Sequence, residues 1–172
     1  TKQLLTRNVF LFSFYLAGMR VSDVVQMKWA NVQGDRIYYI MNKNQKNLSL
    51  KIHDKLRKIL DEYLPTKSSQ TDYIFPELRE AANNPKDILR VVKTANKRLN
   101  RYLAQIAERA GITKKITMHV SRHSFGNISG DRIPLQVLQK LYNHSDIKTT
   151  IDYQQNFVNK DLDDALDSVI GF

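Results

Sequence analysis

Four short stretches of the sequence combine residue types that can act together on a phosphodiester. They are GMRVSD at 18–23, two lysines in the polar segment 42–46, HVSRHSF at 119–125 and NHSDIKTTIDY at 143–153. The candidate site residues within them are Arg20, Asp23, Lys43, Lys46, His119, Arg122, His144 and Tyr153. Each stretch alone is a weak signal, because most arginines and lysines are surface cations. Their joint chemistry is more informative.

These residue types can transfer a phosphoryl group to a tyrosine. Two arginines can clamp one phosphate through forked hydrogen bonds and neutralise the charge that develops in the transition state. Histidines can donate to phosphate oxygens or move protons near neutral pH, and a lysine ammonium can protonate a departing alkoxide. A tyrosine phenol can attack phosphorus and form a covalent ester. Ionising that phenol at pH 7 costs roughly 4 kcal/mol, which a positive site with a nearby base can offset.

The charge of the chain indicates a polyanionic partner. The 172 residues contain 27 Lys and Arg against 17 Asp and Glu, a formal net charge of +10. A surplus of this size favours nucleic acid or anionic lipid, although a merely soluble basic protein fits the composition too. Basic residues concentrate in 86–115, whereas four aspartates lie in 161–167. The candidates for phosphate contacts in DNA are Lys46, Lys93, Lys97 and Arg101.

Composition excludes several other classes. The chain has no cysteine, so it can hold neither disulfides nor thiolate metal sites, and a reducing intracellular setting is expected. No apolar run approaches the roughly 20 residues that a membrane span needs, so no membrane partner is predicted. The length is that of about one domain.

Hydrophobic periodicity predicts a mainly α (α+β) fold, a helical domain with one small antiparallel sheet. Ser22 is the predicted N-cap of the second helix. Strands are predicted at 36–41 and 47–52, with a hairpin between them. Helices are predicted at 3–17, 23–28, 54–64, 88–110 (with Pro85 at its start), 119–129, 134–142, 146–154 and 160–170.

The four stretches, in this order and spacing, resemble the motifs of the tyrosine recombinase (phage integrase) family over residues 17–153. The resemblance implies an active-site set, with Tyr153 as nucleophile and Asp23 in a supporting role. That set comprises Arg20, Lys43, His119, Arg122, His144 and Tyr153. Lys46 is a rival to Lys43, since the hairpin varies in length within the family. Asn143 stands where the family usually has glycine, and asparagine is the next-best residue for a left-handed position.

The resemblance also implies the reaction and its partners. DNA would be cut through a 3′-phosphotyrosine and rejoined without metal, ATP or any other cofactor. The partner would be double-stranded DNA, bound by a homotetramer formed from protein that is monomeric in free solution. We expect a cytoplasmic, nucleoid-associated protein, and expect 1–172 to be one catalytic domain, a fragment without the family's N-terminal DNA-clamping domain.

Several alternatives remain open at this point. His119 and His123 have the spacing of zinc ligands, but Val120 stands where a zincin-type site needs glutamate. Two further alternatives are a catalytically silent DNA-binding module and a type IB topoisomerase, which relaxes DNA by the same chemistry. The predicted helix at 160–170 has an apolar stripe that packs either on its own domain or on a neighbouring protomer.

Overall fold

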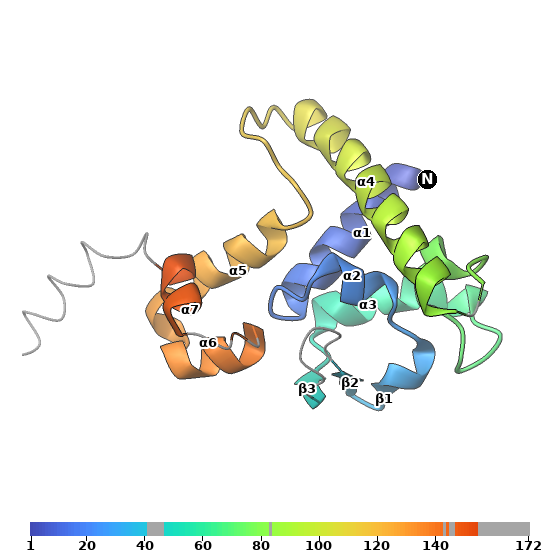
Figure 1. The fold of residues 1–172 in the computed structure, drawn as a ribbon, viewed down its shortest axis with the longest axis horizontal. Coiled ribbons are helices and arrows are strands. Elements are labelled where there is room, and N and C mark those ends of the chain that lie inside the picture. Colours follow the sequence, from blue (N-terminus) through green and yellow to red (C-terminus); the bar gives the residue numbers. More distant parts are fainter. Residues whose placement is uncertain (41–46, 83, 143, 145–146, 155–172) are drawn as a thin grey trace, which may run out of the picture.

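Helices make up most of the structure, and a small sheet lies at one edge of it, as a computed structural model of the chain shows (Figure 1). The structure describes residues 1–40, 47–82, 84–142, 144 and 147–154, with the backbone alone for 131, 147 and 152–154. The α-helices are α1 (Lys2–Tyr15), α2 (Val21–Val25), α3 (Asp54–Tyr63), α4 (Pro85–Arg109), α5 (Val120–Ser129), α6 (Leu135–Tyr142) and α7 (Ile147–Gln154). Short 3-10 helices cover Trp29–Asn31, Leu64–Thr66, Pro76–Leu78 and Gly130–Arg132. The predicted helix at 160–170 lies outside the described residues.

The sheet is antiparallel, as predicted, and has the order β1-β2-β3. The strands are β1 (Val32–Gln33), β2 (Arg36–Ile40) and β3 (Asn47–Lys51). In β2, Ile37 and Tyr39 are buried while their neighbours face outward, so one face of the sheet joins the core. The edge strand β1 was not predicted, because two residues are too few to show a period. The segment 41–46, with Lys43 and Lys46, lies outside the described residues.

Helix α1 lies at the centre of the helical layer, in contact with α2, α3, α4 and α5. Val9, Phe12 and Leu16 are fully buried on it. The ring of Phe12 meets that of Phe75 edge to face, with centroids 5.1 Å apart. This apolar face anchors the elements that carry the candidate site residues.

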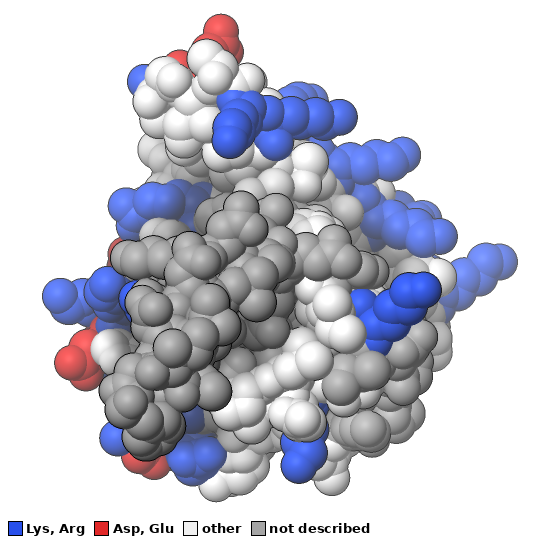
Figure 2. Space-filling model, turned by 90° about the vertical axis from the view of Figure 1, so that its left-hand side faces the viewer, with Lys and Arg blue, Asp and Glu red and all other residues white. Residues whose placement is uncertain are grey.

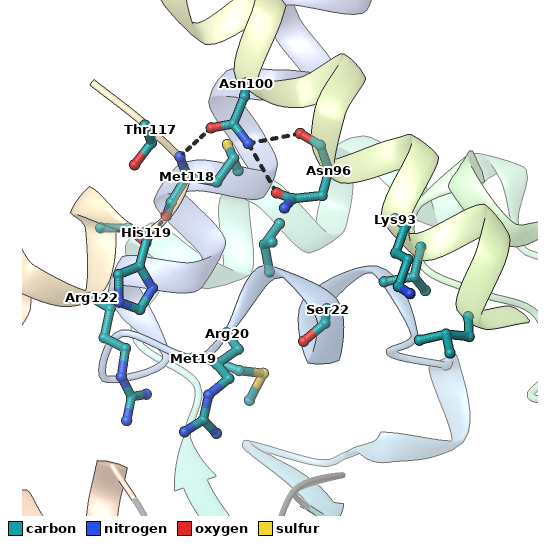
Figure 3. A pocket seen from close by; sticks show the side chains of 14 residues that line it. Met19, Arg20, Ser22, Lys93, Asn96, Asn100, Thr117, Met118, His119 and Arg122 are labelled. Atoms are coloured by element: carbon teal, nitrogen blue, oxygen red, sulfur yellow. Dashed lines mark hydrogen bonds between the residues drawn. The ribbon is translucent and has the colours of Figure 1, made fainter. Parts of the chain in front are cut away.

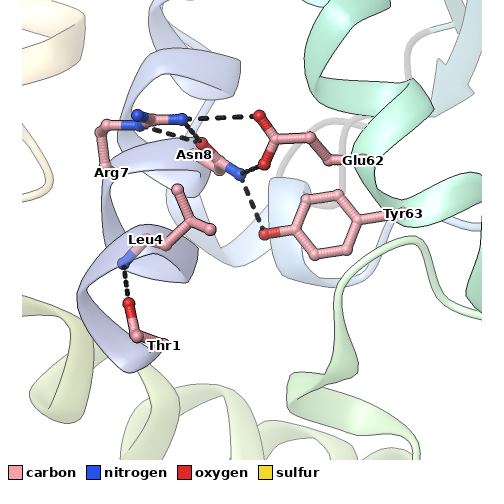
Figure 4. Close-up of polar contacts among 6 residues, drawn as sticks. All are labelled: Thr1, Leu4, Arg7, Asn8, Glu62 and Tyr63. Carbon is pink, nitrogen blue, oxygen red and sulfur yellow. Dashed lines mark hydrogen bonds and ion pairs between the residues drawn. The ribbon is translucent and has the colours of Figure 1, made fainter.

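A polar cluster fastens α1 to α3 (Figure 4). The fully buried Asn8 donates to Glu62 Oε2 at 2.7 Å and to Tyr63 Oη at 3.2 Å. Arg7 donates to Asn8 Oδ1 at 2.9 Å and reaches the same carboxylate. Both polar atoms of the Asn8 side chain have hydrogen-bond partners, so the cluster fixes the register of the two helices and leaves neither atom unpaired.

The turn between α1 and α2 corrects one prediction. Ala17 and Gly18 both have positive φ, 55° and 70°, and reverse the chain within two residues. Arg20, not Ser22, is then the N-cap of α2, because the Arg20 carbonyl already accepts from the amide of Val24 at 3.0 Å. Ser22 lies inside the helix. The early start places the Arg20 side chain at a helix end.

Helix α4 is the long basic helix that the sequence predicts. Asn84 caps it by accepting from the amide of Asp87 at 2.8 Å, and Pro85 occupies its first turn. Its inward stripe comprises Val92, Ala95, Leu99, Leu103 and Ala107. An ion pair between Arg98 and the buried Glu77 carboxylate holds its middle. None of the helices in the described part of the chain is both long and apolar enough to cross a membrane.

Candidate active site

A cleft of about 490 Å³ opens between α4 on one side and the starts of α2 and α5 on the other. Its chemically notable lining residues are Arg20, Lys93, Asn96, Asn100, His119 and Arg122. In Figure 3, His119, Arg20 and Arg122 lie together, opposite the side chains from α4. Three of the predicted site residues therefore share one cavity, although about a hundred residues separate the first from the others in the sequence.

Arg122 is built into the scaffold. Its side chain is almost fully buried, at 2% exposure. The guanidinium donates from Nη1 to the Gly18 carbonyl at 2.9 Å and from Nη2 to the Tyr142 carbonyl at 2.7 Å. It also stacks on the Tyr142 ring, 3.8 Å from its centroid, while the Tyr142 hydroxyl donates back to the Arg122 carbonyl. The planar fork of arginine suits this set of acceptors, so its charge is held in one place.

Gly18 allows the first arginine motif to approach α5 this closely. A Cβ at Gly18 would lie 2.8 Å from Arg122 Cα and 3.2 Å from Tyr142 Oη. Contacts that short require the backbone to shift, and the positive φ disfavours any other residue. Two physical features therefore require glycine at the start of the GMRVSD motif: the positive φ of the backbone and the close approach of Arg122.

His119 is the N-cap of α5 and lines the cleft within electrostatic reach of both arginines. Partial burial lowers the pKa of its imidazole, and the nearby His123, Arg122 and Arg20 lower it further. Both causes disfavour the charged form, so the neutral form of His119 is favoured at pH 7. Its ring meets that of His123 edge to face at 4.8 Å. The part of the chain that the structure describes holds no group of three or more potential metal ligands.

His144 contacts the buried guanidinium from α6–α7. Its Nε2 lies 3.3 Å from Arg122 Nη2 and its Nδ1 lies 3.0 Å from Thr150 Oγ1. A guanidinium can only donate, so in this contact Nε2 accepts and the proton resides on Nδ1, which donates to Thr150. The backbone carbonyl of His144 accepts from Gln139 at 3.2 Å. The fourth motif thus joins the second arginine motif directly.

Asp23 lies behind the cleft, on α2, where it is buried. Together with Tyr39 of β2 it lines a small cavity of about 160 Å³. Burial raises the pKa of the Tyr39 phenol, the Asp23 carboxylate raises it further, and Arg122 acts in the opposite direction. The Asp23 carboxylate and the Arg122 guanidinium therefore both lie within electrostatic reach of the Tyr39 phenol.

The remaining candidates fall on other parts of the chain. Tyr153 belongs to α7, three residues after Thr150, and its side chain is not among those described. Lys43, Lys46 and Asn143 lie outside the described residues. Lys93, Lys97 and Arg101 are exposed on α4, with Lys93 at the cleft itself.

Sequence reasoning missed the residues that support this site. Asn100 accepts from the amide of Met118 at 2.8 Å and donates to both the backbone and side-chain oxygens of Asn96 (Figure 3). It thereby ties the residue before His119 to α4. The one available signal was a pair of asparagines four apart in a basic helix, a spacing that shares a helix face.

The family model described as "Phage integrase family" matches residues 2–160. The chain belongs to this family. Tyrosine recombinase XerA of Pyrococcus horikoshii is 26% identical over 162 residues, which are 92% of this chain and 53% of that protein. The chain therefore spans about half the length of this relative.

Solved recombinase and integrase structures confirm the fold. A crystal structure of XerA recombinase superposes with a TM-score of 0.59 and 18% identity over 95% of this chain and 62% of that chain. The crystal structure of a lambda integrase dimer bound to a COC′ core site gives a TM-score of 0.61 and 18% identity, over 87% of this chain and 42% of that one. The predicted mainly helical, tyrosine-recombinase-like fold is confirmed.

Proposed function

We propose that this chain is the catalytic domain of a site-specific DNA recombinase that cuts and rejoins DNA through a 3′-phosphotyrosine on Tyr153. The observation that carries the proposal is the meeting of three separate motifs around Arg122. Arg20 and His119 line the same cleft, and His144 contacts the guanidinium. Family membership and similarity to tyrosine recombinases agree with this chemistry.

Each residue has a role that fits its geometry. The scissile phosphate binds in the cleft, where Arg122 supplies a fixed charge and Arg20 a more accessible one. The Tyr153 phenol gives its proton to neutral His119 and its oxygen bonds to phosphorus. The bond from phosphorus to the 5′ oxygen breaks, and Lys43 protonates that oxygen, with Lys46 as the rival donor. His144 orients the Arg122 guanidinium toward the phosphate, and Asp23 supports the arginines.

The energy of the phosphodiester is kept in the phosphotyrosine bond, so the reverse attack by a 5′-hydroxyl rejoins DNA. The reaction thus needs neither metal nor nucleotide. The same steps would serve a type IB topoisomerase, which differs only in rejoining the original ends. Similarity to XerA and to lambda integrase favours strand exchange.

Double-stranded DNA is the proposed partner. The net charge of +10 and the exposed Lys93, Lys97 and Arg101 of α4 provide phosphate contacts. Lys and Arg side chains predominate along the right-hand edge of one face, whereas at its left they are mixed with Asp and Glu (Figure 2). The lambda integrase in the similar structure is bound to DNA as a dimer. We propose that the protein acts on DNA as a homotetramer, because each broken strand needs its own tyrosine. We also propose that it is a monomer in free solution and that it resides on the nucleoid.

Covalent adducts on a nicked suicide substrate test the proposal. Such DNA loses the leaving strand, so the phosphotyrosine accumulates and shifts the protein on a denaturing gel. Tyr153→Phe should abolish the shifted band and leave DNA binding nearly intact. Tyr73→Phe, at a residue that does not line the cleft, is the matched control and should retain the band.

Three results would contradict the assignment. Adduct that persists in Tyr153→Phe would assign the nucleophile to another residue. Binding without adduct in the unaltered chain would indicate a silent DNA-binding module. Relaxation of plasmids that lack any recombination site would indicate a topoisomerase.

A further inference from the structure

Two serines face each other inside the apolar core between α1 and α5. Ser13 on α1 and Ser121 on α5 are both fully buried, and their Oγ atoms lie 2.7 Å apart. Buried hydroxyls in such a setting require partners, because an unpaired one costs free energy. The pair joins two helices whose residues are far apart in the sequence.

Each serine also meets the backbone beside a candidate site residue. Ser13 Oγ lies 2.5 Å from the Met19 carbonyl oxygen, and Met19 directly precedes Arg20. On the other side, Ser121 Oγ lies 2.8 Å from the Met118 carbonyl oxygen. Both distances allow the hydroxyl to donate to the carbonyl.

Met118 directly precedes His119, and both methionines are buried. A continuous path of polar contacts therefore runs from the backbone before Arg20 to the backbone before His119. The amide of Met118 is held in turn by Asn100, so α4 joins the same path.

The number of protons determines how the pair behaves. The two hydroxyls supply two protons for three contacts, so one serine donates across to the other, which donates to its own backbone carbonyl. If either hydroxyl is removed, the remaining serine still has its carbonyl as acceptor. Each single variant thus loses the link between the helices without leaving a buried donor unpaired.

We propose that Ser13 and Ser121 are positioning residues that hold Arg20 and His119 at their working separation in the cleft. Ser121 belongs to the lining of the cleft, but its hydroxyl is fully buried and engaged by Ser13 and Met118. Each hydroxyl acts through the carbonyl of the methionine that precedes Arg20 or His119. The importance of this separation for catalysis rests on the proposed function. The pair sets the positions of the two side chains whether or not the chain cleaves DNA.

A double-mutant cycle measures the positioning. Single-turnover cleavage of the suicide substrate at saturating DNA is compared for Ser13→Ala, Ser121→Ala and the double variant. We expect each single variant to be slower by about tenfold, equivalent to about 1.4 kcal/mol, with DNA affinity unchanged. The double variant should also be about tenfold slower rather than hundredfold, because the link is already broken in each single variant.

Ser129→Ala is the matched control. Ser129 is buried on the same helix and donates to the carbonyl three residues earlier, Gly126, at 2.7 Å, the same local geometry that Ser121 has with Met118. It forms no part of the path to α1. Its substitution should lower the melting temperature about as much as Ser121→Ala does while leaving the cleavage rate unchanged.

A titration of His119 in DNA-free protein, followed by NMR, gives a readout that needs no activity. In the unaltered chain and in Ser129→Ala the pKa of His119 should lie equally below its ordinary value. In Ser13→Ala and Ser121→Ala it should move upward, because Arg20 is no longer held beside the imidazole. His123 and Arg122, the other side chains that lower the pKa of His119 electrostatically, are unaltered in all four proteins.

The outcomes separate cleanly. Independent, multiplying rate losses, or equal slowing by Ser129→Ala, would overturn the proposal. An identical His119 pKa in all variants would overturn it as well. If the unaltered chain forms no adduct, the proposed function fails, and an upward shift restricted to Ser13→Ala and Ser121→Ala would still support the positioning role.

Discussion

The two walls of the cleft both carry cations, but they hold them differently. On the α5 wall, Arg122 is buried and bonded to the carbonyls of Gly18 and Tyr142. On the α4 wall, the exposed Lys93 lines the cleft, and Lys97 is exposed four residues farther along the same helix. The first wall fixes one charge to a single position, whereas the second offers several charges that can follow a flexible partner.

The difference teaches what each wall can contribute. A charge that is already in place stabilises a transition state without further reorganisation, so its removal should lower the rate of cleavage. Exposed charges favour binding by releasing counterions from DNA, so their removal should lower the affinity for DNA and its dependence on salt. Substitutions on the two walls should therefore alter different measured quantities.

The largest effect is expected at the arginines. Arg122→Ala and Arg20→Ala should each slow adduct formation by at least about 10²–10³-fold, the usual cost of one preorganised donor. Only Arg122→Ala should also lower the melting temperature, because only it leaves buried carbonyls without their donor. Thermal denaturation and single-turnover rates on the same samples check this. Equal melting temperatures would show that the burial of Arg122 is not structural.

Gly18→Ala should come next, through stability. A left-handed alanine costs roughly 1–2 kcal/mol, and the short approach to Arg122 adds an overpacking cost of about 1–3 kcal/mol. Gly34→Ala is the matched control, because Gly34 has φ +59° but no atom within 4 Å of the added Cβ. Denaturant unfolding should give the larger loss of stability at Gly18. Equal losses would mean that α5 yields to the methyl group at no cost.

A smaller effect, confined to binding, is expected on α4. Replacing Lys93, Lys97 and Arg101 with Ala should flatten the plot of log affinity against log salt by about 0.9 for each phosphate that is no longer neutralised. Replacing Lys2, Lys55 and Lys58, which are exposed outside the cleft, removes the same charge and should change the slope less. The cleavage rate at saturating DNA should stay near that of the unaltered chain. A slope that falls equally in both triple variants would assign binding to net charge alone.

The smallest effect concerns pH. Because the folded-state pKa of His119 is lowered, the unfolded chain binds a proton more readily, and acidification from about pH 7 to pH 5 should reduce the free energy of unfolding. His119→Gln should remove that part of the loss, so its stability falls less steeply over the same range. Urea unfolding at several pH values measures both slopes. Parallel curves would contradict the lowered pKa.

The sequence predicted the main elements because they carry periods. The long basic helix, the hairpin strands and the helix after His119 lie within a few residues of their expected places. The Ser22 cap was wrong, because two residues with positive φ, Ala17 among them, turn the chain earlier than a capping rule foresees. The beginning and end of a helix depend on its entry path as well as on its residues.

The meeting of Arg20 with His119 and Arg122 was expected from their joint chemistry and from the family resemblance, not from hydrophobic periodicity. Periodicity places residues on a face of one element and carries no information on which elements meet. The Ser13–Ser121 pair shows this limit, since 108 positions separate its members. In the sequence, Ser13 is a lone serine in an apolar helix and Ser121 lies within a motif, and neither position identifies its partner.

The central place of α1 has a consequence for synthesis. Its apolar face is covered partly by α4 and α5, which leave the ribosome long after it. At roughly 5–20 residues per second, Val9 and Phe12 wait several seconds for that cover. Over this interval α1 can pack on α2, on α3 and on Phe75, and its contact with Glu62 and Tyr63 through Asn8 can form before α4 and α5 arrive. The nascent chain is therefore open to chaperones, and to wrong partners, on the face that later packs against α4 and α5.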